Sequence, residues 1–183
     1  MPQTRPSLKT LWRDGWSVIQ ARWQLRSAAV LGQRVRLWGR LALHNSGTLI
    51  VGERVRLVST VVPLELAIGP QGRLEIGAGA YINYGCSIAA TQLVQIGPRC
   101  NLGTYVLLMD NDFHSLAPEQ RHVMPPSAPI ILEENVWIGG RVVVLSGVTI
   151  GAGSVIGAGS VVTKSIPPRS LAVGVPARVI RTL

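Results

Sequence analysis

Hydrophobic residues between Ile131 and Pro167 recur at every sixth position. This period matches neither the alternation of a β-strand nor the 3.6-residue repeat of an α-helix. A second small or branched residue lies four positions after each one, so two positions in every six suit an interior. The pattern predicts a solenoid of short strands with a turn about every six residues. The first set is Leu132, Ile138, Val144, Ile150, Ile156 and Val162, and the second is Val136, Val142, Val148, Ser154, Ser160 and Ile166.

The same rhythm extends towards the N-terminus, although less regularly. It begins near Val35, and hydrophobic residues followed by glycine appear at Val51, Ile68, Ile76 and Ile96. Coils that begin near residues 51, 76, 96, 132 and 150 predict an all-β domain over residues 35–183 with about five to six coils. Each coil should add about 4.8 Å along the axis, which is the spacing of neighbouring strands.

Two segments leave this rhythm. Leu108 and Leu132 are twenty-four positions apart instead of six, so residues 108–131 are predicted to form an extruded, proline-rich loop. In a repeat protein such an insertion lies on one side of the solenoid and is the first place to search for function. At the other end, Pro167 and Pro168 end the last coil, and residues 167–183 are predicted to fold back as a C-terminal cap.

Residues 7–28 are predicted to form a helix with Ser7 as its N-cap. Hydrophobic side chains at spacings of three and four form one stripe, which basic residues flank. Two interpretations stay open: the stripe packs on the solenoid or a neighbouring subunit and caps an exposed end, or it contacts a membrane interface. The stripe consists of Leu8, Leu11, Trp12, Trp16, Ile19 and Trp23.

Positive charge is concentrated in the same part of the chain. Residues 1–40 hold eight basic residues and one acidic residue, a net charge of +7 out of +9 for the whole chain. Such a segment predicts an anionic partner, either a membrane surface or the phosphate of a lipid-linked substrate. No nucleic-acid recognition motif accompanies the charge, so no nucleic-acid partner is expected. Residues 1–34 are therefore interpreted as a separate basic, tryptophan-rich helical segment.

The two cysteines bear on the compartment. Cys86 and Cys100 lie four positions after hydrophobic anchors and are predicted to be reduced core residues on different sides of the solenoid, without a disulfide. The sequence contains no run of about 18 uncharged apolar residues, and its start lacks the apolar core of a secretory signal. These features predict a cytoplasmic protein, and the basic helix adds an expectation of peripheral contact at the inner face of the membrane.

One histidine lies in the predicted loop. A histidine can accept a proton near neutral pH, as a general base that activates a hydroxyl must do. His114 follows Asp110, Asn111 and Asp112, and we expect a carboxylate or a backbone carbonyl to hold its ring in one tautomer.

Six segments, in this order, resemble the maltose and galactoside O-acetyltransferases and the polysaccharide O-acetyltransferases. The resemblance covers roughly residues 50–183, while residues 1–45 are more similar to surface-polysaccharide acetyltransferases than to the disaccharide enzymes. It implies a left-handed parallel β-helix with three hexapeptides in each triangular coil. The segments are INYGCSI (82–88), DNDFH (110–114), PEQR (118–121), VWIGG (136–140), AGSVVTK (158–164) and GVPARVIR (174–181).

The resemblance also implies an activity. This is acetyl transfer from acetyl-CoA to a sugar hydroxyl, in surface polysaccharide or lipopolysaccharide biosynthesis, by a homotrimer whose sites lie between subunits. No metal is implied. The resemblance makes His114 the catalytic base and Asn83 a second catalytic residue, and assigns acceptor binding to Tyr81, Asp112, Arg121 and Met124. It assigns coenzyme A binding to Trp137, Gly140, Ala158, Thr163, Lys164, Arg178 and Arg181.

Three alternatives remain open at this point. An amino-sugar N-acetyltransferase would use the same base to deprotonate an ammonium group. A γ-type carbonic anhydrase shares the fold but needs three histidine ligands, and His44 lies far along the coils from His114 and His122. A non-catalytic β-helix scaffold would leave the histidine and the basic residues without a role.

Overall fold

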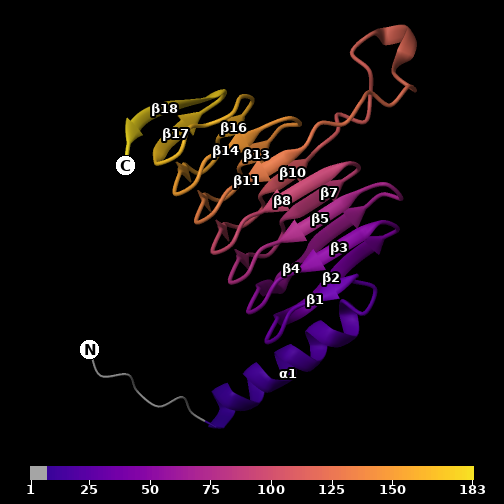
Figure 1. The fold of residues 1–183 in the computed structure, drawn as a ribbon, viewed down its shortest axis with the longest axis vertical. Helices are drawn as coiled ribbons and strands as arrows, with labels where there is room; N and C mark the ends of the chain where they lie inside the picture. The colour runs from indigo at the N-terminus through magenta and orange to yellow at the C-terminus, as the bar shows by residue number, and fades with distance from the viewer. Residues whose placement is uncertain (1–7) are drawn as a thin grey trace.

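The computed structural model describes residues 8–183 (Figure 1). A helix, α1 (Leu8–Gln24), precedes a solenoid of short strands that stack along one axis. The N-cap predicted at Ser7 lies outside the described residues, as do the side chains of Leu8 and Leu11.

The strands form three faces of a prism. Face 1 is a parallel sheet of six strands, β1 (Val30–Leu31), β3 (Thr48–Val51), β5 (Arg73–Ile76), β8 (Leu93–Ile96), β11 (Ile130–Leu132) and β14 (Thr149–Ile150). Two long strands, β2 (Arg36–Asn45) and β4 (Arg56–Ile68), pass from face 2 to face 3, so they belong to both.

The remaining strands lie on one of these two faces. Face 2 continues from β4 through β6 (Tyr81–Ile82), β9 (Asn101–Leu102), β12 (Trp137–Ile138), β15 (Val155–Ile156), β17 (Ser170–Gly174) and β18 (Ala177–Thr182). Face 3 continues through β7 (Ser87–Ala90), β10 (Leu107–Met109), β13 (Val143–Val144) and β16 (Val161–Val162).

Equivalent residues of successive coils stack in the interior. Leu57, Ile82, Leu102, Ile138 and Ile156 pair in register on face 2, and none is more than 1% exposed. Burial of each such side chain contributes about 1.5–3 kcal/mol, which offsets the entropy of ordering the coil. All interior positions predicted between residues 131 and 167 are buried, so the predicted β-helix is confirmed.

The solenoid is longer than predicted. It has about seven turns, against the expected five to six, because β1 and β2 form an additional first coil that starts at Val30 rather than near Val35. The six-residue rhythm fails there because β2 and β4 run across two faces without a tight corner between them. Elsewhere the corners are tight. A Cβ added to Gly139 would lie 2.6 Å from the backbone nitrogen of Ala158 in the next coil.

Both cysteines lie in the interior, as predicted. Cys86 and Cys100 are free and buried, and their thiols donate hydrogen bonds to the carbonyls of Gly103 and Glu133 at 3.0 and 2.9 Å. Burial raises the pKa of each thiol to about 11, which keeps both protonated at neutral pH.

Helix α1 packs on the first coil, but not through the predicted stripe. Ser17, Ala21 and Leu25 are the residues that face the solenoid and are buried. The tryptophan side of the helix points away, because small residues four apart allow a closer approach than indoles do. The Gln24 side chain fixes this orientation by accepting a hydrogen bond from the backbone N–H of Leu41 at 2.8 Å. The prediction that the stripe packs on the solenoid is therefore wrong for its described side chains, because Trp12, Trp16, Ile19 and Trp23 are all more than half exposed.

The C-terminal tail continues face 2 before it turns back. Strand β17 pairs in parallel with β15, and β18 pairs antiparallel to β17. The Ser154 hydroxyl ties the tail to the last full coil, because it donates to the Pro167 carbonyl at 2.8 Å and accepts from the Ser170 N–H at 3.1 Å. The cap is thus a β-hairpin that lengthens the sheet of face 2.

Candidate functional site

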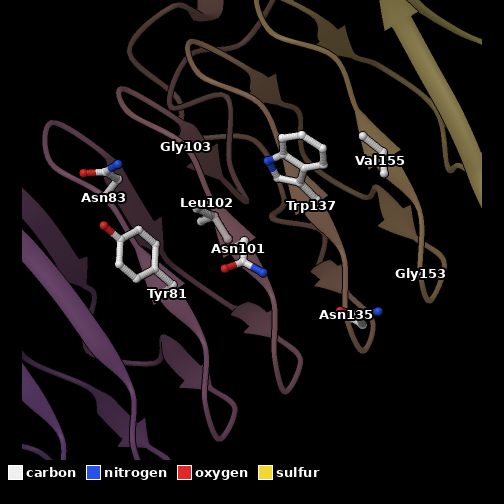
Figure 2. Close-up of a pocket in the computed structure, with 9 residues that line it drawn as sticks. All are labelled: Tyr81, Asn83, Asn101, Leu102, Gly103, Asn135, Trp137, Gly153 and Val155. Carbon is white, nitrogen blue, oxygen red and sulfur yellow. The ribbon is translucent and has the colours of Figure 1, made fainter. Parts of the chain in front are cut away.

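A groove of about 640 Å³ lies on face 2. Figure 2 shows Tyr81, Asn101 and Trp137 projecting on the same side from the neighbouring strands β6, β9 and β12. Trp137 is 57% exposed, which leaves a large aromatic surface without a partner in this chain. The other lining residues are Asn83, Leu102 and Gly103 at one side and Asn135, Gly153 and Val155 at the other.

The groove forms part of a longer row of outward side chains. Strand pairing places Tyr81, Asn101, Trp137 and Val155 in register across face 2. Through β17 the row continues to β18, which carries Arg178 and Arg181. The corner between faces 2 and 3 runs alongside this row, and Gly140 and Ala158, which have little or no side chain, lie at this corner. The Gly159 N–H joins their two coils by donating a hydrogen bond to the Gly140 carbonyl at 2.9 Å.

The loop that holds His114 leaves the solenoid elsewhere. It connects β10 on face 3 to β11 on face 1, contains a short 3-10 helix η1 (Pro118–Gln120), and projects from the body in Figure 1. The groove therefore lies on the face opposite the corner from which the loop emerges, and the loop contributes none of the groove-lining residues. His114 is exposed, as are Asp112, Arg121 and Met124.

A backbone carbonyl orients the His114 ring. Nδ1 lies 2.8 Å from the carbonyl oxygen of Arg121, and since a carbonyl only accepts, Nδ1 carries the proton. Nε2 is then the unprotonated nitrogen of the neutral ring, available to accept a proton. The sequence left a carboxylate or a carbonyl open as the partner, and the structure has the carbonyl.

Asp110, at the start of the loop, holds the loop to the solenoid and does not contact the His114 ring. Asp110 is fully buried, and its carboxylate accepts hydrogen bonds from the backbone N–H groups of Thr91, Gln92 and Leu93 at 2.7–2.8 Å and from the Thr91 hydroxyl. Asn111 adds a second anchor by donating to the Pro125 carbonyl at 2.8 Å. The start of the loop is thereby fixed to the solenoid wall, and the end of the loop is tied to its start.

The structure divides the predicted site residues into two sets. The first set lies on face 2 and its edges: Tyr81, Asn83, Trp137, Gly140, Ala158, Arg178 and Arg181. The second lies at the corner between faces 3 and 1, in the loop or just after β16: Asp112, His114, Arg121, Met124, Thr163 and Lys164. A single chain does not bring the two sets together.

Sequence reasoning missed a third group of residues. Four arginines, Arg34, Arg36, Arg54 and Arg56, surround a hollow of about 340 Å³ at the N-terminal end of face 2. Their position was readable in principle, since Arg36 and Arg56 directly precede the interior residues Leu37 and Leu57 and so point outward. The charge count by segment separated them, because Arg34 and Arg36 fall within residues 1–40 and Arg54 and Arg56 fall outside.

Histidines and acids do not gather into a metal site within residues 8–183. His44 lies on β2, whereas His114 and His122 lie in the loop. Nor does any helix among the described residues have the length and apolar character needed to cross a bilayer.

Comparisons with known proteins agree with this architecture. The family model described as bacterial transferase hexapeptide (six repeats) matches residues 129–164. The chain is 36% identical over 158 residues to nodulation protein L of Rhizobium meliloti, a match that covers 86% of this chain and 82% of that protein. The chain belongs to the hexapeptide-repeat acyltransferases.

Two other members of the family are named as acetyltransferases. Galactoside O-acetyltransferase of Escherichia coli is 42% identical over 110 residues, covering 60% of this chain, and the chain spans only 54% of that enzyme's length. A hexapeptide-repeat acetyltransferase of Vibrio cholerae, solved with acetyl coenzyme A, superposes with a TM-score of 0.64 at 28% identity and covers 90% of this chain and 76% of that one.

The residues of this acyltransferase fit such a co-substrate. A long acyl-carrying arm needs space with little side-chain bulk. Gly140 and Ala158, three positions after Trp137 and Val155, have small or no side chains at the corner between faces 2 and 3. A Cβ added to Gly140 would lie 3.3 Å from the backbone oxygen and the hydroxyl of Thr104, a tight contact that the absence of a side chain avoids. The phosphates at the other end of the molecule need cations. Arg178 and Arg181 are cationic side chains on β18, at the far edge of the same sheet.

Proposed function

We propose that the protein transfers the acetyl group of acetyl-CoA to a sugar hydroxyl during the synthesis of surface polysaccharide or lipopolysaccharide. The observation that carries this proposal is the His114 ring, which is held by the Arg121 carbonyl in the tautomer that a general base needs. The motifs shared with sugar O-acetyltransferases support a sugar as the acceptor, as does the name of the Escherichia coli relative.

In the proposed reaction acetyl-CoA supplies the acetyl group as a thioester. Nε2 of His114 takes the proton of the acceptor hydroxyl while that oxygen attacks the thioester carbonyl. Asn83 and Tyr81 position the acceptor, and a backbone N–H group stabilises the negative charge that develops on the carbonyl oxygen. The proton on His114 then passes to the departing thiolate, so no covalent enzyme intermediate is needed.

The division of the site residues supports a homotrimer. If face 2 of one chain contacts the loop corner of a second chain, the two sets of residues meet at the interface. Contact between different surfaces of identical chains is heterologous, and such contacts close into a ring when the rotation between neighbouring chains closes, as it does in a trimer. The exposed apolar side chains of the loop, Leu116, Val123 and Met124, support a partner at this place.

Mixing two inactive variants tests this shared site. His114→Ala alters only the loop set and Trp137→Ala only the face 2 set. When the two proteins are unfolded and refolded together, random pairing gives roughly one intact site in four, and activity should return to about that fraction of wild type. A mixture as inactive as each variant alone, despite proven mixed trimers, would place both residues in a site within one chain.

Helix α1 is proposed to bind the cytoplasmic face of the membrane. Trp12, Trp16 and Trp23 are 65–80% exposed on the side of the helix that faces away from the solenoid. Arg22 and Arg26 flank these indoles, and tryptophan beside basic residues suits the interface of an anionic bilayer. Sedimentation with vesicles of phosphatidylglycerol should capture the wild-type protein but not a Trp16→Ser/Trp23→Ser variant, whereas equal recovery of both would contradict membrane contact.

Acceptor-dependent release of free coenzyme A tests the reaction itself. Purified protein is incubated with acetyl-CoA and with sugars, amino sugars, nucleotide sugars or lipid-linked saccharides, and the product is identified by mass and alkaline lability. An alkali-labile ester on a sugar is the expected product. An alkali-stable amide would show that the enzyme acetylates an amine and not a hydroxyl. A folded trimer that neither binds nor consumes acetyl-CoA would overturn the enzyme assignment.

A further inference from the structure

The arginine cluster is a concentrated positive surface beside the groove. Arg34 and Arg54 occupy the corner between faces 1 and 2 in the first two coils, and Arg36 and Arg56 point outward from the adjoining strands. Gly79 continues the corner in the third coil, where an added Cβ would meet nothing closer than 3.7 Å. The hollow is therefore open to a ligand from the side of face 2.

Little negative charge balances these arginines. Asp14 of α1 lies 3.6 Å from Arg36, and within residues 8–183 no carboxylate forms an ion pair with Arg34, Arg54 or Arg56. Side chains of like charge repel each other, so the cluster raises the energy of the chain unless an anion occupies it. Guanidinium groups bind phosphate oxygens with paired, charge-assisted hydrogen bonds.

The cluster is continuous with the acceptor end of the groove. Arg36, Arg56 and Tyr81 pair in register across face 2, and the Arg56 guanidinium lies 5.0 Å from the centre of the Tyr81 ring. Arg178 and Arg181, proposed to bind the phosphates of coenzyme A, lie at the opposite end of the same sheet. The arginine cluster and this pair are therefore two separate cationic surfaces at opposite ends of face 2.

The spacing fits a sugar joined to a phosphate group. Neighbouring coils are about 4.8 Å apart, so Arg56 is one coil and Arg36 two coils from Tyr81, a span of about 5–10 Å. A diphosphate attached to the anomeric carbon of a sugar extends over a similar distance from the ring hydroxyls. An acceptor with its first sugar against Tyr81 would place its diphosphate among the arginines.

We infer that this arginine cluster binds the diphosphate of a diphosphate-linked saccharide, which is the acceptor class of the enzyme. The inference rests on the proposed function. A nucleotide and a polyprenyl lipid are the two sources of such a diphosphate. Helix α1 lies next to the cluster through the Asp14–Arg36 pair, so an acceptor anchored in a membrane can reach it.

Equilibrium binding of inorganic pyrophosphate tests the cluster without any catalysis. The protein is first saturated with coenzyme A, so that the phosphate site of the co-substrate is filled. Arg54→Gln and Arg56→Gln should each weaken pyrophosphate binding about tenfold, as expected for loss of one charge-assisted contact. The control is Arg73→Gln, which removes the same charge from face 1, where Arg73 pairs with Glu75, and should leave the affinity unchanged.

Two further ligands identify the source of the diphosphate. Farnesyl diphosphate in detergent micelles that binds more tightly than pyrophosphate supports a lipid-linked acceptor, and UDP that binds more tightly supports a nucleotide-linked one. Equal binding of all three supports recognition of the diphosphate alone. For each ligand, Arg56→Gln should lower the binding affinity by the same factor as it lowers the affinity for pyrophosphate.

Two results would overturn the inference. One is equal pyrophosphate affinity of Arg56→Gln and Arg73→Gln. The other is a loss of coenzyme A affinity in Arg54→Gln, which would assign the cluster to the co-substrate. Either result leaves acetyl transfer intact, whereas failure of every acceptor to release coenzyme A would overturn the proposed function and not the anion site.

Discussion

The regular coils from β11 to β16 and the first two coils, built from β1 to β4, use one prism in different ways. In the regular coils each strand has two or three residues and each corner is tight, so stacking alone defines the backbone. In the first two coils β2 and β4 run across two faces, and the end is closed by α1 rather than by another coil. Regular repeats therefore provide a uniform wall, whereas the candidate site residues lie at outward positions, in the insertion and at the irregular end.

The largest expected effect breaks the regular region. Ile138 lies between Leu102 and Ile156 of the adjacent coils and is fully buried. Ile138→Ala should lower the free energy of unfolding by about 3 kcal/mol, since truncation leaves a cavity shared by three coils. Chemical denaturation measures this change.

The matched variant in the irregular region is Leu37→Ala. Leu37 is also fully buried, but it stacks on only one coil, through Leu57. In a repeat protein damage at an end stays local, so faster hydrogen exchange should be confined to α1 and residues 30–45. Exchange that accelerates equally in all coils would show that the two regions do not differ in this way.

A second variant tests how the loop is joined to the wall. The Asp110 carboxylate accepts hydrogen bonds from three backbone N–H groups. In Asp110→Asn one of its oxygens becomes an NH₂ group, which cannot accept and would face an N–H donor. We expect a loss of about 2–3 kcal/mol in stability, together with a lower kcat and an unchanged KM for acetyl-CoA, because the loop holds His114 and not the groove. A raised KM for acetyl-CoA with normal kcat would mean that Asp110 supports the groove instead.

Alkaline pH probes the coils between the two regions, where Cys86 and Cys100 lie. Burial raises their pKa from 9.0 to about 11 in the folded chain. As the pH rises, the unfolded chain therefore loses these protons before the folded chain does. The free energy of unfolding should be unaffected by the thiols below pH 9 and should fall as the pH rises from 9 to 11, by up to about 2 kcal/mol per thiol. In a Cys86→Ala/Cys100→Ala variant this part of the pH dependence should disappear.

The smallest expected effect compares the two sides of α1. Gln24→Ala removes the acceptor of the Leu41 N–H and should cost about 1 kcal/mol. Trp16→Ser changes a 65% exposed side chain and should alter the stability by less than about 0.5 kcal/mol. Thermal unfolding of both variants distinguishes them, and a larger loss for Trp16→Ser would contradict the packing described for the helix.

The same contrast explains what the sequence could predict. Leu132 to Val162 recur every six residues because each must fill the same interior position, so the fold, the loop and the interior cysteines were readable. The first coil was not, since β2 lacks the tight corners that set the period. The packing side of α1 was also misread: hydrophobicity pointed to Trp16 and Trp23, whereas close contact with β2 required Ser17 and Ala21.

The site was readable only in part. The candidate residues come from the resemblance to a family and stay predictions, and their separation into two sets depends on which corner each coil position occupies. The anchoring of Asp110 by backbone groups of another coil leaves no trace in the local sequence. The arginine cluster depends on the stacking of Arg34 on Arg54 and of Arg36 on Arg56, which are twenty positions apart.

The most direct test of the account is the steady-state rate of acetyl transfer by His114→Gln, which keeps a polar side chain of similar size in the exposed loop. With an acceptor that wild type uses, we predict a kcat lower by about 10²–10⁴-fold, the usual contribution of a general base, with an unchanged oligomeric state and normal binding of acetyl-CoA. A kcat within a few fold of wild type would contradict the role of His114 as the base.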